Sequence, residues 1–241
     1  QALAFAFAAR YQIQMTLPFS MTLEPRLLLA SFSTPQSMLS WSINRPGFQT
    51  ASKVAWIEVR NAELPPGVDP EQLVADRLAD RGIPDAVALI TSRTVAQHDC
   101  VRKTVEETTA SCLATVGLSN GERVGHRQSE KPLMGTINTL LHVDQPLSSG
   151  AFIELVSIVA MARTTAILDS GVHRNGIAIT GTGTDCIVVA APRAEPEARY
   201  AGMHTAIGEA AGAAAYEAIR SGTEIWRTDF EALLQNSAAA E

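Results

Sequence analysis

The chain has 241 residues, of which 46% are hydrophobic and 18% are charged, and its formal net charge is −6. This composition is typical of one large or two small globular domains and not of a disordered segment. The acidic balance argues against nucleic acid as the main partner, because phosphate binding needs a basic face. No run approaches the roughly 18 uninterrupted apolar residues of a membrane span, so no membrane partner is expected.

Cysteine and histidine usage gives little sign of a disulfide framework or a metal site. Cys100, Cys112 and Cys186 are an odd number without C-x-x-C spacing. The five histidines show neither H-E-x-x-H nor H-x-H spacing. Buried free thiols in a reducing compartment are the default, so we expect a cytoplasmic protein without a metal of its own.

The first 60 residues are predicted to be mostly β-structure, with Pro35 and residues 44–47 as turns. The predicted strands are residues 11–16, 26–33, 37–43 and 53–59. Asp69 as N-cap with Pro70 at the first helical position then opens a helix, which Gly82 ends.

Strands alternate with long helices in the rest of the chain. Further strands are predicted at residues 86–91, 101–109, 111–118 and 137–143, and on both sides of residues 180–185. A helix at residues 149–170 is apolar nearly all round and is expected to be buried. A second long helix should end near Arg220, and a last one should cover residues 223–234. We predict one α/β domain over residues 1–241, with a mixed sheet, packed long helices and a β-rich N-terminal part.

Residues 180–185, Thr-Gly-Thr-Gly-Thr-Asp, are the most informative stretch and lie between two apolar, β-prone segments. Glycine allows a ligand to approach the main chain, and successive N–H groups can bind an anion. Hydroxyls and a carboxylate at the end of a buried strand therefore indicate a site facing a cleft. A Gly/Thr turn capped by Asp185 explains the same residues. The stretch is neither a Walker loop nor a dinucleotide fingerprint.

An ordered set of motifs resembles the adenosylcobinamide amidohydrolase (CbiZ) family. The motifs are residues 114–120, residues 135–138 (Gly-Thr-Ile-Asn), residues 180–185, His204-Thr205 and Gly208-Glu209, with Leu39-Ser40 and Asn44 as a weaker match. The resemblance covers most of the chain after about residue 23. It implies hydrolysis of the amide that joins a corrin propionate arm to aminopropanol or its phosphate, with adenosylcobyric acid as product, in corrinoid salvage. No cofactor of the enzyme's own is implied, because the cobalt arrives with the corrinoid. A homo-oligomer is left open.

The chain departs from the family pattern at two places. Met161-Ala162-Arg163 stands where the resemblance predicts Glu-Ala-Lys, and Met203 stands where it predicts lysine. Loss of a carboxylate together with a lysine fits a compensated pair, a shifted substrate or a weakened activity.

Amide hydrolysis needs an activated water or nucleophile, an oxyanion site and an acid for the leaving amine. We expect Asp185 to orient a partner or act as a base, and His204 to carry a proton. Thr184 and Glu209 are further catalytic candidates. The substrate-binding candidates are Asn44, Asn120, Thr136, Asn138, Thr180, Gly181, Thr182 and Gly183, with the N–H groups of both glycines holding an oxyanion. Structural roles compete with these: a helix cap for His204, a hairpin turn for Asn120-Gly121, a sheet edge for Asn138 and a solvated helix face for Glu209.

Two other functions stay as alternatives. Residues 117–121 spell G-x-S-x-G, and Ser119, Asp185 and His204 follow the α/β-hydrolase chain order. That motif needs a helix directly after the serine, whereas residues 122–125 indicate a turn into a strand, so a serine hydrolase of another amide or ester is the weaker hypothesis. The departures at Met161, Arg163 and Met203 motivate the second alternative, a non-catalytic corrinoid-binding protein.

Overall fold

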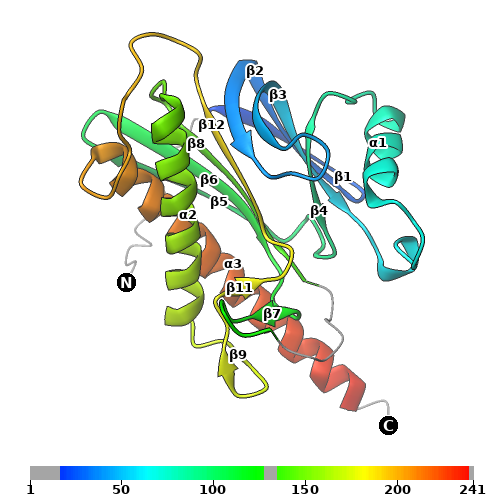
Figure 1. Ribbon diagram of the computed structural model, residues 1–241. Coiled ribbons are helices and arrows are strands. Elements are labelled where there is room, and N and C mark those ends of the chain that lie inside the picture. The colour runs from blue at the N-terminus through cyan, green and yellow to red at the C-terminus, as the bar shows by residue number, and fades with distance from the viewer. Residues whose placement is uncertain (1–16, 128–134, 239–241) are drawn as a thin grey trace, which may run out of the picture.

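The structure, a computed structural model, describes residues 17–127 and 135–238 (Figure 1). An eight-stranded mixed sheet has the order β4-β3-β2-β12-β8-β6-β5, with β1 beside β2. Its strands are β1 Phe19–Glu24, β2 Leu27–Ser40, β3 Gly47–Glu58, β4 Val87–Thr91, β5 His98–Val105, β6 Thr108–Val116, β8 Ile137–Val143 and β12 Cys186–Ala191. The helices are α1 Pro70–Asp80, α2 Ser149–Asp169 and α3 Ala206–Ala238, with a 3-10 turn at Asn61–Glu63. The predicted mixed α/β class with a β-rich first half is confirmed; the strand predicted at 11–16 lies outside the described residues.

The sheet curls so strongly that β4, at one edge, reaches β8 near the other. The side-chain Nδ2 of Asn138 on β8 donates a hydrogen bond of 2.7 Å to the carbonyl of Ile90 on β4. Because side chains alternate along a strand, Leu140 points to the concave face and Leu141 to the convex face. Apolar side chains such as Trp56 and Leu113 fill the concave face. All three helices pack on the convex face, α1 over β3 and β4, and α2 with α3 over the strands from β12 to β5.

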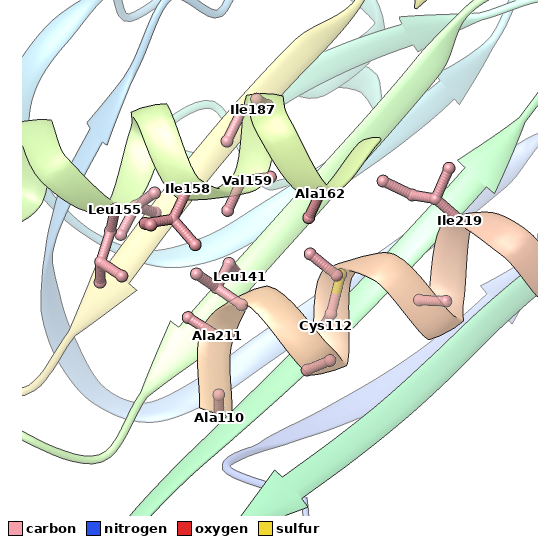
Figure 2. Packing of buried hydrophobic residues seen from close by; sticks show 14 of the residues in the cluster. Ala110, Cys112, Leu141, Leu155, Ile158, Val159, Ala162, Ile187, Ala211 and Ile219 are labelled. Atoms are coloured by element: carbon pink, nitrogen blue, oxygen red, sulfur yellow. The ribbon is translucent and has the colours of Figure 1, made fainter. Parts of the chain in front are cut away.

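The larger buried side chains of α2 pack against α3, whose buried hydrophobic residues are mostly alanines. Figure 2 shows Ile158 and Ala162 of α2 above Ala211 and Ile219 of α3, with Cys112 of β6 beneath. A Cβ atom on Gly222 would lie 2.6 Å from Val116 Cγ2, so this glycine allows α3 to lie directly on β6. The predicted break near residue 221 is therefore wrong, and α3 is one continuous helix.

Helix α2 has nearly the predicted bounds, but it is not buried all round. Ile153, Met161 and Leu168 are 59%, 43% and 43% exposed, while eight other side chains pack inward. Among the described residues, α2 is long and apolar enough to cross a membrane by length and composition alone. Its contacts with the sheet and α3 are those of a core helix.

Three strand predictions are also corrected. Strand β2 continues through Pro35, where the register with β3 shifts between Ser31 and Gln36, because a bulge accommodates a proline. Residues 101–109 contain the turn of the β5–β6 hairpin, with Glu106 at a φ of 52°. The strand predicted before residue 180 and the start of the loop both lie outside the main sheet. β10 (Ile177–Ala178) pairs with β9 (His173–Arg174), and β11 (Gly181–Thr182) pairs with β7 (Gly121–Glu122). The helix start at Asp69 is confirmed, since its Oδ1 accepts from the N–H of Glu71 at 2.9 Å.

Candidate active site

A pocket of about 620 Å³ opens where the parallel strands β8 and β12 begin. We call this the pocket end of the sheet, and the end where β8 and β12 finish the far end. One wall of the pocket is apolar and includes Trp41, Ile43, Val59, Leu64 and Ile90. The other wall is polar and includes Asn120, Thr136, Asn138, Gly183, Thr184 and Asp185. A mostly apolar cavity with a few converging polar groups is typical of a small-molecule site.

The carboxylate of Asp185 is held by donors on every side. Its Oδ1 accepts from the N–H of Ile137 at 2.9 Å and from the hydroxyl of Thr182. Its Oδ2 accepts from the N–H of Thr182 at 2.8 Å and lies 3.2 Å from Nη1 of Arg163. The two oxygens of a carboxylate offer about four acceptor positions, and all four are in use here. Asp185 therefore joins α2, β8 and the Gly/Thr loop, and it has no free lone pair for a substrate proton.

These donors stabilise the ionised form of Asp185, whereas burial destabilises it. Only 5% of its side chain is exposed, and burial raises the pKa of the Asp185 carboxyl above its ordinary value. The Arg163 guanidinium and the hydrogen bonds from Thr182 and Ile137 act in the opposite direction. The four groups around the carboxyl all donate hydrogen bonds, and the O–H of a protonated carboxyl would be a further donor without an acceptor among them. We therefore describe Asp185 as a carboxylate paired with Arg163.

Arg163 is the functional residue that sequence reasoning noted but did not place in the site. It is the single basic residue of α2, an otherwise mostly apolar helix, and it stands where the family resemblance predicts lysine. Its side chain is only 18% exposed. A lone cation in a buried helix requires a partner, and that requirement is the sequence signal for the pair with Asp185.

Two threonine hydroxyls meet on the polar wall. The Oγ1 of Thr136 lies 2.7 Å from Oγ1 of Thr184 and donates to the main-chain oxygen of Thr184 at 2.8 Å. The Thr184 hydroxyl also lies within donating distance, 3.2 Å, of the Gly135 carbonyl oxygen. The start of β8 and the start of β12 thus place a nucleophile-type oxygen and a proton-carrying neighbour side by side.

Asn120 and Asn138 each bring an unpartnered acceptor to the pocket. They are 6% and 1% exposed, and the Oδ1 atom of each is buried without a hydrogen-bond partner. A buried carbonyl oxygen without a donor costs free energy. A ligand with N–H or O–H donors would remove that cost, so both residues suit the recognition of an amide or an amino alcohol.

His204 and Glu209 lie at the other end of the molecule from the pocket. Both are exposed, and neither lines the pocket. The preceding Ala201 donates its N–H to Glu154 of α2 at 2.6 Å, whereas Arg163 of the same helix contacts Asp185. Nine helical residues correspond to about 14 Å along the axis. Thr205 caps α3 by accepting from the N–H of Gly208 at 3.0 Å. The structure therefore does not bring His204 or Glu209, two of the expected catalytic residues, to this pocket.

Four more candidates have structural contacts and do not line the pocket. The side chain of Asn44 donates to the carbonyl of Ala86 at 2.9 Å and accepts from the N–H of Ala88 at 3.0 Å, and so attaches the β2–β3 turn to β4. Thr180 and Gly181 connect the loop to Glu122, and Thr182 supports Asp185. Of the two glycines expected to hold an oxyanion, only Gly183 faces the cavity.

The serine-hydrolase arrangement is not formed. Ser119 lies outside this pocket, on the far side of Gly135, and the nearby chain forms a turn and β7 instead of a helix. Cys186 does line the pocket, but burial raises the pKa of its thiol to about 11, so it is protonated and a poor nucleophile at neutral pH. The described residues contain no cluster of His, Cys, Asp or Glu that could hold a metal ion.

Comparison with known proteins identifies the family of this chain. A family model described as CbiZ, adenosylcobinamide amidohydrolase, matches residues 12–229. No curated protein sequence matches the chain. Solved structures with some similarity are the PH0078 protein from Pyrococcus horikoshii OT3 (11% identity, 86% of this chain and 79% of that chain, TM-score 0.44), a Burkholderia sp. beta-aminopeptidase (9%, 83% and 78%, 0.45) and the L-aminopeptidase D-Ala-esterase/amidase of Ochrobactrum anthropi (10%, 85% and 82%, 0.35). These three similarities are too distant to carry an argument.

Proposed function

Because the chain belongs to the adenosylcobinamide amidohydrolase family, we propose that it hydrolyses its substrate's amide bond in the pocket at the pocket end of the sheet. The protein is an amide hydrolase that acts on adenosylcobinamide in corrinoid salvage. None of the departures from the family pattern, Met161, Arg163 and Met203, lines this pocket, and Arg163 keeps a cation beside Asp185. That removes the motive for a non-catalytic carrier.

The substrate enters with its amide-bearing arm inward. A cavity of about 620 Å³ suits a drug-sized group and not a whole corrinoid. The planar macrocycle then lies at the mouth, where the Trp41 indole is 46% exposed and is fixed by a 2.8 Å hydrogen bond from its Nε1 to the Asp185 carbonyl. Asn138 accepts a hydrogen bond from the amide N–H or the hydroxyl of the aminopropanol group.

The hydroxyl of Thr136 is the nucleophile in this proposal. It adds to the amide carbon to form an ester with the corrin propionate, and water then hydrolyses that ester. The Thr184 hydroxyl passes a proton toward the leaving amine, and the main-chain N–H of Gly183 is the oxyanion donor. Asp185 acts as a positioning residue, because it holds Ile137, and with it Thr136, against the loop that carries Thr184.

The observation that carries the proposal is the hydroxyl pair of Thr136 and Thr184 inside a cavity that also holds two unpartnered amide oxygens. Purified protein incubated with adenosylcobinamide should yield adenosylcobyric acid, measured by chromatography. Thr136→Val keeps the shape and should lower the rate by roughly 10⁶-fold, the scale seen when a nucleophile is removed. Normal turnover by a folded Thr136→Val protein would remove Thr136 from the reaction.

A further inference from the structure

The proposed nucleophile lacks a base. A threonine hydroxyl reacts only when a neighbouring group takes its proton. Among the described residues that line the pocket there is no histidine, lysine or glutamate. Asp185 has no free lone pair, and the Cys186 thiol is protonated. The described part of the pocket therefore supplies a nucleophile without the group that activates it.

One nitrogen beside the nucleophile would become a base if it were freed. The main-chain nitrogen of Thr136 is part of the peptide bond to Gly135, and an amide nitrogen accepts no proton near neutral pH. As a free α-amino group it would have a pKa near 7.7–8.0. It would then lie within the same residue as Oγ1, with a pKa close to the working pH, as a general base requires. Threonine paired with its own terminal amine is a known form of activated nucleophile.

The surroundings of Gly135 favour attack on this peptide bond. The Thr136 hydroxyl can close a five-membered ring onto the carbonyl carbon that precedes it. The oxygen of that carbonyl lies 3.2 Å from the Thr184 hydroxyl, which polarises it. A Cβ atom on Gly135 would lie 2.7 Å from the Gly117 carbonyl oxygen and 2.8 Å from Asn120 Oδ1, so only glycine fits and no side chain shields the carbonyl.

Asn120 supplies an independent observation that points to an amine. Its Oδ1 is buried, lacks a partner and is aimed at Gly135. An α-ammonium group at Thr136, directly after Gly135, would carry three donors, and an N–H donor is what this oxygen lacks. With the peptide bond intact, Asn120 Oδ1 has no such donor.

We propose that the chain cleaves its own Gly135–Thr136 peptide bond, so that the freed α-amino group of Thr136 serves as the base for its hydroxyl; this rests on the proposed role of Thr136. Thr136 Oγ1 adds to the Gly135 carbonyl carbon, the C–N bond breaks, and the nitrogen takes the proton that the hydroxyl loses. The resulting ester is hydrolysed by water, which leaves a carboxylate on Gly135 and restores the hydroxyl. The two pieces stay together, because β8 pairs with β6 across the break and β12 pairs with β2.

The test is the mass of the native protein under denaturing conditions. Two chains, residues 1–135 and 136–241, with Thr136 as a new N-terminus, are expected for the purified protein and for the control His204→Ala. Thr136→Ser should also give two chains, and Thr136→Ala should give one. A folded wild-type protein that is a single chain and forms adenosylcobyric acid at full rate overturns the cleavage but not the proposed function. Two chains from Thr136→Ala overturn it as well, since the cut would then not need the hydroxyl.

Activity separates the two proposals and tests the base. Two chains without adenosylcobyric acid would support the cleavage and defeat the proposed function. If the amine is the base, the rate at saturating substrate should rise with pH up to about 8, as the α-amino group loses its proton. A rate that is flat from pH 6.5 to 8.5 in the two-chain protein would overturn the role of the amine. Circular dichroism on each variant verifies that it is folded.

Discussion

Strand β8 places one polar side chain at each end of the concave face, and the two have opposite fates. Asn138 at the pocket end is 1% exposed, lines the cavity and has a side-chain oxygen without a hydrogen-bond partner. His142 at the far end is 6% exposed and lies against Phe32, with ring centroids 5.3 Å apart. Burial lowers the pKa of His142 to about 4, so the ring is neutral near neutral pH. Burial of a polar group therefore does not mark a site, whereas an unpartnered acceptor that faces a cavity does.

Helix α2, on the convex side of the sheet, shows a similar difference between the pocket end and the far end. At the pocket end Arg163 holds the carboxylate of Asp185, and at the far end Glu154 accepts the N–H of Ala201. Both carboxylates attach α2 to a loop, but only Asp185 borders the pocket. The residues of the family motifs are thus divided between the two ends. The motifs near His204 lie at the far end, where the loop before α3 is attached to α2.

The largest contrast between the ends is expected from paired carboxylate substitutions. Asp185→Asn replaces one acceptor oxygen with an NH₂ donor that faces other donors, and it leaves Arg163 unpaired. The resulting misplacement of Thr136 and Thr184 should lower the rate by roughly 10²-fold, and the unpaired charge should lower stability by about 3–5 kcal/mol. Glu154→Gln keeps an acceptor for Ala201 and should change turnover little. Turnover and urea unfolding on the same preparations give both numbers. Equal rate losses in the two variants would end the distinction between the ends.

The far end should show its role in stability below neutral pH. The folded pKa of His142, about 4, lies below its ordinary 6.5, so its contribution is fully present above pH 6.5 and is lost as pH falls toward 4. The loss amounts to about 3 kcal/mol for a shift of this size. His142→Phe should remove that part of the slope in the unfolding free energy between pH 7 and 4. A variant with the wild-type slope would show that other groups are responsible.

A smaller effect is expected from the cation at the pocket end. Arg163→Met leaves Asp185 without a charge partner but with three hydrogen bonds that still hold the carboxylate, so it should cost only about 2 kcal/mol. Arg163→Lys restores the charge that the family pattern predicts and should recover most of it. Melting temperature and the rate of adenosylcobyric acid formation are the measurements. If Lys and Met behave alike, charge pairing is not what Arg163 supplies.

The smallest effect is expected from the histidine that the motif singled out. His204→Ala removes an exposed side chain at the far end and should leave turnover within about twofold and stability within about 0.5 kcal/mol. Steady-state kinetics with adenosylcobinamide decide this. A loss of tenfold or more in turnover would bring the far end into the reaction and contradict the placement of the site.

Local signals in the sequence predicted the elements that local chemistry determines. Asp69 with Pro70 marked the start of α1, and β8 has the predicted bounds. The turn predicted at Pro35 and the helix break predicted near residue 221 are wrong, because a bulge accommodates the proline and one helix continues through Gly222, where contact with Val116 requires a glycine. Such tertiary reasons are not visible in a local pattern.

The candidate site was predicted in part, for a related reason. Asn138 and Asp185 lie at or next to the start of an apolar strand, and such polar residues beside apolar runs can be recognised in the sequence. The curl that brings β4 to β8 arises from pairing between distant segments, and it decides which of these groups share a cavity. For the same reason Arg163 appeared only as a departure from a motif until its contact with Asp185 was known.

The antiparallel pairing of β2 with β12 has a consequence for how the protein is made. It joins residues 37–40 to residues 188–191, so the middle of the sheet consists of strands that are synthesised far apart in time. Contacts of such long sequence separation slow folding, since a large loop must close before they form. A nascent chain that has reached only β8 must leave one side of β2 unpaired, and unpaired strand edges invite aggregation. Productive folding therefore has to wait for β12 to leave the ribosome.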